Sequence, residues 1–444
     1  MFNTDNLEVR KLLLTGNFGL EKEMLRITED GYLSHSPHPF PQGEPGITRD
    51  FCENQTEINT PIFKTADEVV NNLYAHTQRI NDRLCTLSPR EYLWPFSNPP
   101  YIRNEEDIPV AQFHGDLKHK THYREYLSGR YGRYKMAFSG IHFNYSFSGN
   151  LLRRNYEAQT GKHIEKGEEN AEYREYESRI YLDLAEQLVA YGWVMVTLTA
   201  ASPLMDTSFF ESGRTGGDQF SGFASVRCSE MGYWNAFAPV LNYSSIAAYA
   251  DSIQQYVDEG WISAPSELYY PIRLKPRGEN TLDNLRRGGV NHIELRMIDL
   301  NPLQKEGIDV RDVQFAQLLL VWLATKPRQH FTSANQVMAN TNYKQAAHYD
   351  LDSSHVVNPG GQVYTLREAT LLVLQLMDDF YRSIERSDGL FDEAIELINF
   401  QRKKITQPTD YRYADLIRRN YSGGFVNKGL SLCAKYSALA AAKN

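Results

Sequence analysis

The sequence lacks the features that mark several large classes of protein. Its four cysteines are scattered and form no CxxC pair, which argues against a disulfide framework or a zinc ribbon and fits a reducing compartment. The longest nearly apolar run, Leu188 to Ala201, is shorter than the roughly 20 residues that a membrane-spanning helix needs. We therefore expect no membrane partner and interpret this run as one buried helix.

An excess of basic residues is also missing. The formal net charge is -8 and the isoelectric point is about 5.9. Proteins that bind nucleic acids need a basic surface that releases counterions, so general nucleic-acid binding is excluded. The N-terminus shows no basic segment followed by an apolar one, so we expect no secretory signal and a cytoplasmic location. Nothing in the pattern indicates an obligate protein partner.

Glycine-rich nucleotide loops of the forms GxxxxGK[ST] and GxGxxG are absent. Any bound nucleotide therefore has to be held by metal ions and arginines. No period of about 20 to 50 residues repeats, and no long linker rich in glycine, serine or proline divides the 444 residues. We predict a single catalytic domain over residues 1–444.

Capping and periodicity predict most of the helices. A first helix is expected to begin at Asn3 or Thr4 and to end at Gly16. Capping boxes, in which a threonine is followed three residues later by a glutamate, open two more helices at Thr65 and Thr365. Further helices are predicted over 170–187, 310–325 and 431–443, and a strand over 55–60.

Three other segments alternate apolar residues with charged or metal-binding ones: 18–27, 140–147 and 292–297. Side chains on a strand point alternately to opposite faces, so the polar residues of each segment share one face. These residues are Glu21 with Glu23, His142 with Asn144, and His292 with Glu294 and Arg296. The apolar residues between them suit packing under helices.

Each of these strands alone is compatible with an ordinary solvated edge. Carboxylates, a histidine and an arginine that converge on one face instead favour bound cations and an anionic substrate. Basic residues in 269–277 and 285–289 precede the last of these strands. Such basic runs are usually solvated surface, but their position beside an acidic strand favours phosphate binding.

At these residues the sequence resembles the glutamate-cysteine ligase family, most strongly its bacterial enzymes and the N-terminal module of the bifunctional glutathione synthases. The resemblance implies an α+β, glutamine-synthetase-like fold, in which a largely antiparallel sheet has an acidic concave face and is backed by helices. The resemblance covers about residues 10–325. The matching segments follow in order: 18–26, 50–61, 131–132 with 139–146, 201–203, 232–233, 271–275 and 287–302.

The resemblance also implies an activity, the first step of glutathione biosynthesis. The family joins the γ-carboxylate of L-glutamate to the amine of L-cysteine at the expense of ATP. A carboxylate is a poor electrophile, so it must first become γ-glutamyl phosphate. Two or three Mg²⁺ ions and several arginines are expected to neutralise the crowded oxygens. Ligation of another amine and a catalytically silent regulatory homologue remain alternatives.

Residue roles follow by position in the family's motifs. The implied metal ligands are Glu21, Glu23, Asp50, Glu57, His142 and Glu294, with Glu53 as a further candidate. The implied catalytic cations are Arg296 and Arg124. Glutamate is expected at Arg227 and Asn144, the acceptor amino acid at Phe51, Tyr123, Tyr233 and Tyr269, and the nucleotide near Arg273 and Lys275. The chain departs from the family pattern over 113–120, which bears on the identity of the acceptor.

Overall fold

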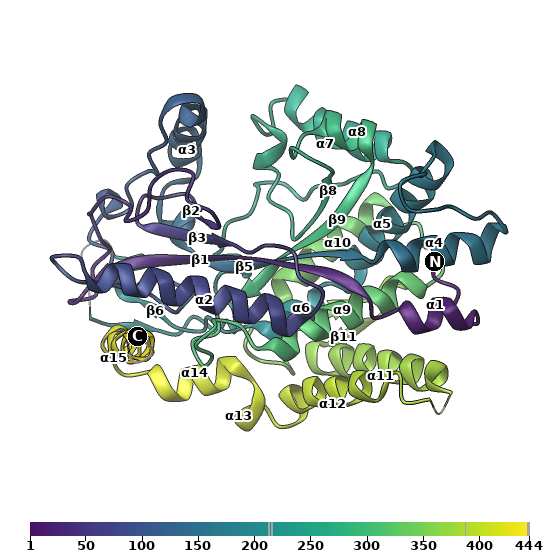
Figure 1. Cartoon of the computed structure of the whole chain (residues 1–444). Helices are drawn as coiled ribbons and strands as arrows, with labels where there is room; N and C mark the ends of the chain where they lie inside the picture. The colour runs from purple at the N-terminus through teal and green to yellow at the C-terminus, as the bar shows by residue number, and fades with distance from the viewer. Residues whose placement is uncertain (212–213, 215, 387, 442–444) are drawn as a thin grey trace.

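An antiparallel sheet forms the centre of the structure (Figure 1). The computed structural model describes every residue except 212–213, 215, 387 and 442–444. Within that part of the chain, the sheet has seven strands in the order β2-β3-β1-β5-β9-β8, with β4 pairing to the C-terminal end of β1. The strands are β1 (Gly16–Thr28), β2 (Ile47–Arg49), β3 (Gln55–Asn59), β4 (Glu91–Leu93), β5 (Gly140–Phe147), β8 (Ile272–Pro276) and β9 (Val290–Asp299).

Helices surround this sheet, and two short ribbons lie apart from it. The α-helices are α1 (Leu7–Leu12), α2 (Ala66–Cys85), α3 (Lys118–Tyr131), α4 (Gly149–Thr160), α5 (Ala171–Tyr191), α6 (Trp193–Thr199), α7 (Ile246–Asp258), α8 (Leu282–Gly288), α9 (Val310–Thr325), α10 (Ser333–Gln345), α11 (Leu366–Glu385), α12 (Asp392–Thr406), α13 (Pro408–Tyr411), α14 (Tyr413–Tyr421) and α15 (Phe425–Ala441). The ribbons pair β6 (Met205–Asp206) with β7 (Asp218–Gln219), and β10 (His355–Val357) with β11 (Val363–Thr365). Short 3₁₀ turns occupy Glu105–Asp107, Gly115–Leu117, Tyr134–Ala137, Thr207–Phe209 and Pro265–Glu267.

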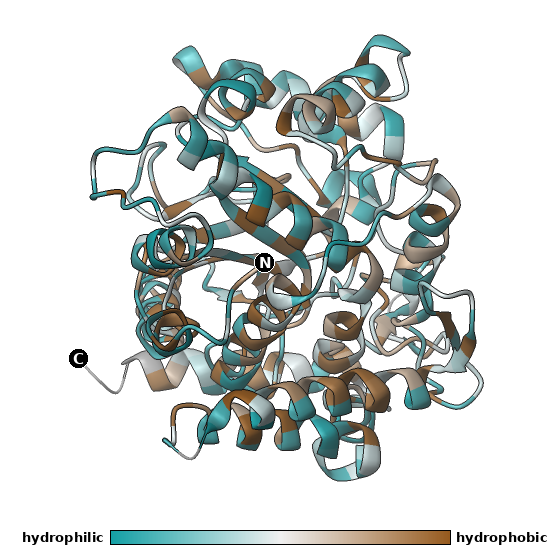
Figure 2. Ribbon diagram, turned by 90° about the vertical axis from the view of Figure 1, so that its right-hand side faces the viewer, coloured by the Kyte–Doolittle hydropathy of each residue, from teal (hydrophilic) through white to brown (hydrophobic). Residues whose placement is uncertain are grey.

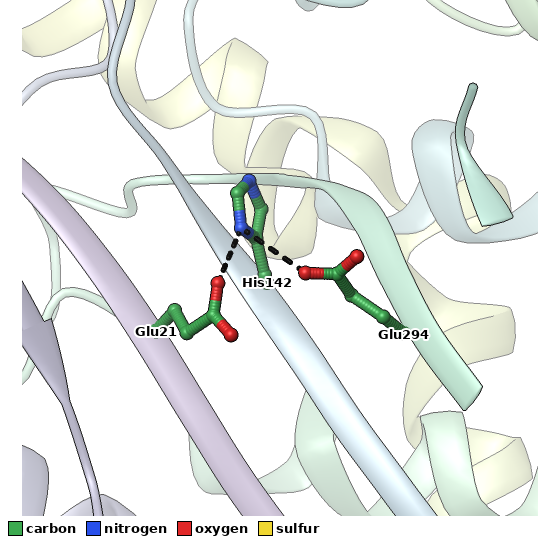
Figure 3. A group of neighbouring side chains, drawn as sticks. All are labelled: Glu21, His142 and Glu294. Carbon is green, nitrogen blue, oxygen red and sulfur yellow. Dashed lines mark hydrogen bonds and ion pairs between the residues drawn. The ribbon is translucent and has the colours of Figure 1, made fainter. Parts of the chain in front are cut away.

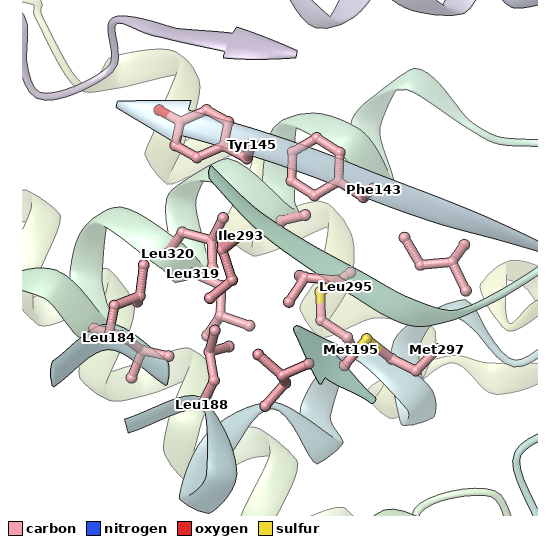
Figure 4. Packing of buried hydrophobic residues seen from close by; sticks show 14 of the residues in the cluster. Phe143, Tyr145, Leu184, Leu188, Met195, Ile293, Leu295, Met297, Leu319 and Leu320 are labelled. Atoms are coloured by element: carbon pink, nitrogen blue, oxygen red, sulfur yellow. The ribbon is translucent and has the colours of Figure 1, made fainter. Parts of the chain in front are cut away.

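The apolar face of β5 and β9 packs against helices α5, α6 and α9 (Figure 4). Figure 2 shows that the helices are hydrophobic (brown) along part of their surface and hydrophilic (teal) along the rest. None of the described helices has both the length and the apolar character to cross a bilayer. The labelled core residues of Figure 4 are Phe143, Tyr145, Ile293, Leu295 and Met297 from the strands, and Leu184, Leu188, Met195, Leu319 and Leu320 from the helices.

Several sequence predictions are confirmed. Both capping boxes are present, with Thr65 and Glu68 opening α2 and Thr365 and Glu368 opening α11. Helix α9 spans the predicted residues 310–325, and the predicted strand over 55–60 is β3. The predicted helix over 431–443 belongs to α15, which begins earlier, and its last two predicted residues lie outside the described part of the chain.

Two predictions on helix boundaries are wrong. The first helix is capped by Asn6 rather than by Asn3 or Thr4, because the Asn6 side chain accepts hydrogen bonds from the Glu8 and Val9 amides, and Gly16 already belongs to β1. The run from 188 to 201 contains the end of α5 and all of α6, separated at Gly192. A Cβ atom at Gly192 would lie 2.0 Å from the Tyr343 hydroxyl, so this close approach requires glycine.

The packing of β9 gives a stability prediction. Leu295 is fully buried under the helices, so Leu295→Ala should leave a cavity and lower the free energy of unfolding by about 2 to 5 kcal/mol. Leu372→Ala on α11 is the matched control, because Leu372 is 42% exposed and its truncation removes little buried surface. Urea denaturation measures both variants. Equal losses in the two would contradict the assigned core.

Candidate active site

Side chains from β1, β5 and β9 form a compact acidic cluster (Figure 3). The strand register sets Glu21 opposite His142, and Asn144 opposite Glu294. One ligand atom from each of Glu21, His142 and Glu294 lies within 4.8 Å of the others. His142 Nδ1 is 2.9 Å from Glu21 Oε2 and 3.7 Å from Glu294 Oε1. The predicted alternation of the strands therefore produces a shared polar face.

The cluster continues towards β3, where carboxylates face one another. Glu23 and Glu57 are directly opposite in the β1/β3 register, an arrangement that is unfavourable for two like charges. Burial, the like charge of Asp50 and that of Glu21 raise the pKa of Glu57 well above its ordinary value. Burial and Asp50 also raise the pKa of Glu23. Crowding therefore favours the neutral form of Glu57, and a bound cation would favour its ionised form, whereas Glu23 is partly compensated by His142, whose Nε2 lies 3.5 Å from Glu23 Oε1.

The β9 side of the cluster is better compensated. Arg296 Nη1 donates to Glu294 Oε1 at 3.1 Å, and Lys275 Nζ lies 3.2 Å from Glu294 Oε2. Burial opposes ionisation of Glu294, but these cations and His142 lower its pKa below the ordinary value. Glu21 behaves similarly: burial opposes its ionisation, but the hydrogen bond to His142 and the charges of His142 and Lys275 together lower the pKa of this carboxyl.

The donor set fits a divalent cation. Asn144 donates through Nδ2 to Glu21 Oε1 at 3.0 Å, while its own Oδ1 atom is buried and accepts no hydrogen bond. Two buried acids outside the cluster are each matched by a basic partner, in the Glu91–Arg26 and Asp312–Lys404 pairs, both at 2.6 Å. Excess carboxylates and an unpaired amide oxygen are the hard oxygen ligands that Mg²⁺ prefers.

A cavity of about 180 Å³ adjoins the cluster. Glu23, Asp50 and Arg296 line it from the sheet side, and Lys135 and Ser266 lie on other parts of its wall. The cluster and the cavity therefore form one continuous site. The predicted site residues that line the cavity are Glu23, Asp50, Phe51, Tyr123, Arg124, Arg227, Tyr233, Tyr269, Arg273 and Arg296.

Arginines give this cavity a positive wall. Arg124 comes from α3, Arg273 from β8 and Arg296 from β9, and Arg227 reaches in from the loop before α7. Burial would lower the pKa of Arg296, but Glu294 and its neighbours raise it, so the guanidinium stays charged. Converging arginines of this kind suit a substrate with several anionic oxygens.

A β-bulge in β9 places two of these arginines. From the Ile141/Ile298 pair to the Phe143/Leu295 pair there are two steps along β5 but three along β9. Arg227 donates to the carbonyl oxygens of Arg296 at 2.9 Å and Ile298 at 3.3 Å on either side of the extra residue. The Arg227 guanidinium is therefore anchored to the same strand that carries Arg296.

Gly140 makes room for this anchor. A Cβ atom at Gly140 would lie 2.2 Å from Arg227 Cζ, so a side chain at this position would displace the guanidinium. The Gly140 amide donates to Glu23 Oε2 at 2.9 Å, which also fixes one of the acids. Gly140, at the start of β5, thus helps to position both the Arg227 guanidinium and the Glu23 carboxylate.

Tyrosine rings form another part of the cavity wall, beside the arginines, since the Arg296 guanidinium carbon lies 5.6 Å from the centroid of Tyr269. The ring centroids of Tyr233 and Tyr269 are 4.4 Å apart, and those of Tyr131 and Tyr233 are 5.0 Å apart, both with edge-to-face geometry. Tyr123 and Phe51 complete this side. The wall is apolar in its body and polar at its hydroxyl tips, which suits a small amphipathic ligand.

Some predicted residues lie elsewhere. Lys275 and Asn144 contact Glu294 and Glu21 in the cluster instead of lining the cavity. Glu53 points away from the cluster, because its carboxylate pairs with Arg49 Nε at 3.0 Å and accepts the His38 and Gln112 amides. Its candidacy as a metal ligand is therefore wrong.

The basic run over 285–289 does not reach the cavity either. Arg286 binds Asp251 at 2.9 Å and Asp283 at 3.2 Å, and both acids are exposed. The solvated-surface interpretation of this run is therefore the one that fits. The segment 113–120 leads into α3, and its Phe113 ring lies 4.9 Å from the Arg124 guanidinium carbon, so it supports a cavity residue.

Other lining residues were not predicted. They come from α3 and the following 3₁₀ turn, where no strand alternation exists to mark them, and from the loop before β8. A strongly basic and aromatic composition over 118–135 is the one signal that would have indicated them. These residues are Leu127, Lys135, Met136, Phe138 and Ser266.

Comparisons with known proteins agree with this geometry. The bifunctional glutathione biosynthesis protein GshAB of Listeria welshimeri is 33% identical over 442 residues, which cover 97% of this chain and 55% of that protein. A glutamate–cysteine ligase of Clostridium acetobutylicum is 32% identical, with 76% of this chain and 77% of that protein covered. The chain spans about half the length of the bifunctional relatives that it matches.

Solved structures show the same fold. The glutamate–cysteine ligase of Francisella tularensis in complex with AMP aligns with a TM-score of 0.82 at 21% identity, over 96% of this chain and 89% of that one. A bifunctional glutathione synthetase from Pasteurella multocida aligns with a TM-score of 0.79 at 25% identity, over 98% of this chain and 54% of that one. The family model for glutamate-cysteine ligase matches residues 3–262 and 238–346. The chain belongs to the glutamate-cysteine ligase family.

Proposed function

We propose that this chain catalyses the ATP-dependent ligation of the γ-carboxylate of L-glutamate to the amine of L-cysteine. The observation that carries the proposal is the junction of an acidic cluster, in which carboxylates crowd one another, with a cavity lined by arginines and tyrosines. Membership of the glutamate-cysteine ligase family supports it. The proposed partners are glutamate, cysteine and ATP, and the proposed location is the cytoplasm.

The first step is transfer of the γ-phosphoryl group of ATP to glutamate. A γ-carboxylate oxygen of glutamate attacks the γ-phosphorus, the bond to the β-phosphate oxygen breaks, and ADP leaves with the electron pair. Arg296 and Arg124 lie on the cavity wall, where they would stabilise the transferring group. Arg273 faces the same space and, with Lys275 beside it on β8, is proposed to hold the nucleotide.

Two or three Mg²⁺ ions, when bound, would supply positive charge that offsets the phosphate oxygens in this step. Glu57 and Glu23 crowd one another beside Asp50, so a cation there would favour their ionised forms, while Glu21 and Glu294 are already oriented by His142 and Arg296. The residues proposed to hold the metal are Glu21, Glu23, Asp50, Glu57, His142 and Glu294.

The second step is attack of the acceptor amine on γ-glutamyl phosphate. The amine nitrogen forms the amide bond, the carbon–oxygen bond to phosphate breaks, and inorganic phosphate and a proton are released. Arg227 is proposed to bind glutamate, with Asn144 supporting the adjoining cluster through Glu21. Phe51, Tyr123 and the two lining tyrosines would enclose the acceptor.

Two other functions stay open to the same assay. An acceptor other than cysteine would use the same activation chemistry with a different fit to the aromatic wall. A silent homologue would bind substrates without turnover, but convergence of the predicted acids and arginines into one site argues against it. ADP release by the purified chain, measured with ATP, glutamate and a panel of amines, separates the three.

The acidic cluster gives a prediction on metal dependence. Glu21→Gln and Glu294→Gln should each abolish ADP formation and weaken Mg²⁺ binding by at least about tenfold, because an amide offers less charge to the ion. Calorimetric titration of the purified protein with Mg²⁺ measures binding without turnover. Glu177→Gln is the control, since Glu177 is a buried glutamate of α5 that pairs with Arg277 outside the cluster. Normal turnover of both cluster variants at limiting Mg²⁺ would remove the metal assignment.

Arg296 should act in catalysis. Arg296→Lys keeps the charge but loses the planar fork, so kcat/KM should fall by about 2 kcal/mol or more in transition-state stabilisation, which is roughly 30-fold. The thermal unfolding midpoint should change little. Steady-state ADP release, followed alongside a thermal melt, checks both, and an unchanged kcat/KM would take Arg296 out of the mechanism.

The order of steps makes a prediction about inhibitors and acceptors. A sulfoximine analogue of the tetrahedral adduct should become a tight inhibitor once ATP phosphorylates it. Cysteine should be the preferred acceptor, and 2-aminobutyrate should also react, because an aromatic wall separates side chains of similar size by only about 1 to 3 kcal/mol. Preference for a large or cationic amine over both would overturn the cysteine assignment and leave the ligase assignment standing.

A further inference from the structure

Glu267 is a buried carboxylate that lies outside the cavity but touches the elements around it. Its side chain is fully buried at the end of the 3₁₀ turn Pro265–Glu267. Oε1 accepts from the Tyr131 hydroxyl at 2.7 Å and lies 3.2 Å from Arg130 Nε, both on the last turn of α3. Oε2 accepts from the amide and the hydroxyl of Ser263 at 2.6 and 2.7 Å. This one carboxylate joins α3 to the segment before β8.

The contact with Tyr131 leads to the cavity wall. Tyr131 packs edge-to-face on Tyr233, which packs in the same way on Tyr269, and the last two line the cavity. The Tyr131 ring therefore stands behind the aromatic wall. A shift of this ring would move Tyr233, because rings in edge-to-face contact have no free space between them.

Asn235 connects the backbone of Glu267 to Tyr269, at the other end of the aromatic wall. Its Nδ2 donates to the Glu267 carbonyl at 3.0 Å, and its Oδ1 accepts from the Tyr269 amide at 2.7 Å. Asn235 is itself buried. Both ends of the ring series, Tyr131 and Tyr269, are thus tied to Glu267.

The ionisation of this network supports a fixed geometry. Burial opposes the charge of Glu267, but the hydrogen bonds from Ser263 and Tyr131 and the charge of Arg130 lower its pKa below the ordinary value. Burial and the bond to Glu267 raise the pKa of Tyr131 to about 12, so its hydroxyl remains a donor at neutral pH. The donor and acceptor roles are therefore constant over the working range of pH.

We propose that Glu267 is a positioning residue for the acceptor amino acid: by holding Tyr131 and the 263–269 segment together, it fixes the spacing of Tyr233 and Tyr269 at the acceptor side of the cavity. This inference rests on the proposed function, since it assumes that the aromatic wall encloses the acceptor. The Glu267 side chain does not contact the acidic cluster, and its segment reaches the arginines of the cavity only through backbone carbonyls, since Arg273 Nη2 donates to Ser266 O at 2.9 Å and to Leu268 O at 2.8 Å.

The test compares the Michaelis constants for cysteine, ATP and glutamate in variants of Glu267 and Tyr131. In Glu267→Gln one of the two carboxylate oxygens becomes an NH₂ group, which cannot accept the bond that Tyr131 donates at Oε1 or, in the other orientation, the two bonds that Ser263 donates at Oε2. We expect KM for cysteine to rise about tenfold and KM for glutamate to stay within about twofold of the wild type, while KM for ATP rises less than that for cysteine because Arg273 is bound by backbone carbonyls of the segment. A brace that serves stability alone would lower the unfolding midpoint and leave the three constants in proportion.

Tyr131→Phe is the second variant, because it keeps the ring and removes the hydroxyl. It should raise KM for cysteine in the same direction, and the double variant should lose less than the sum of the two free-energy changes, because both act through one contact. Tyr176→Phe is its control, since this substitution also removes a tyrosine hydroxyl, and the Tyr176 hydroxyl accepts from Asn155 Nδ2 instead of contacting Glu267. Glu177→Gln controls for loss of a buried carboxylate.

The possible results distinguish failure of the positioning role of Glu267 from failure of the proposed ligase function. Wild-type turnover with an unchanged cysteine KM in both Glu267→Gln and Tyr131→Phe overturns the positioning role alone. Equal increases in all three Michaelis constants, or strictly additive effects in the double variant, also overturn it. Absence of ADP release by the wild type with every amine overturns the proposed function, and the positioning role with it.

Discussion

Repulsion among carboxylates on one face of the sheet is the constraint to which the rest of the site is fitted. Glu21, Glu23, Glu57 and Glu294 cannot all be ionised and buried side by side unless positive charge lies close. The protein supplies Arg296 and Lys275 on the β9 side and His142 in the centre, whereas burial and like charges dominate the surroundings of Glu57 on β3. This difference between the two sides suits the binding of cations near β3, next to a cavity whose arginines can bind anionic oxygens.

Rigidity of the sheet makes this crowding possible. The apolar residues of β5 and β9 are packed against three helices, so the acids cannot separate by moving their strands. One exception on the apolar side is Lys22, which lies between Glu21 and Glu23 and points to the opposite face. Its ammonium donates to Thr77 Oγ1 at 3.0 Å and to the Glu306 carbonyl at 2.8 Å, so hydrogen bonds rather than a carboxylate stabilise it there.

The sheet and its charged face could be predicted from sequence because strand alternation is a local pattern. Glu21 and Glu294 lie where alternation places them, and the two capping boxes fixed the starts of α2 and α11. Lys135 and Glu267 could not be found this way, because their positions depend on how α3 and a loop pack against the sheet. Glu53 failed for the same reason, since a nearby Arg49 and two backbone amides captured its carboxylate.

The bulge divides β9 into two halves that have different structural roles. Before it, Glu294 and Arg296 serve the site; after it, Asp299 accepts from the Ala201 amide at 2.9 Å and the Ser202 hydroxyl at 2.7 Å, which fastens the chain beyond α6. A strand whose length changed by one residue here would turn one half over relative to the other. Insertions and deletions between 295 and 299 should therefore be rejected during evolution, even where the residue types themselves vary.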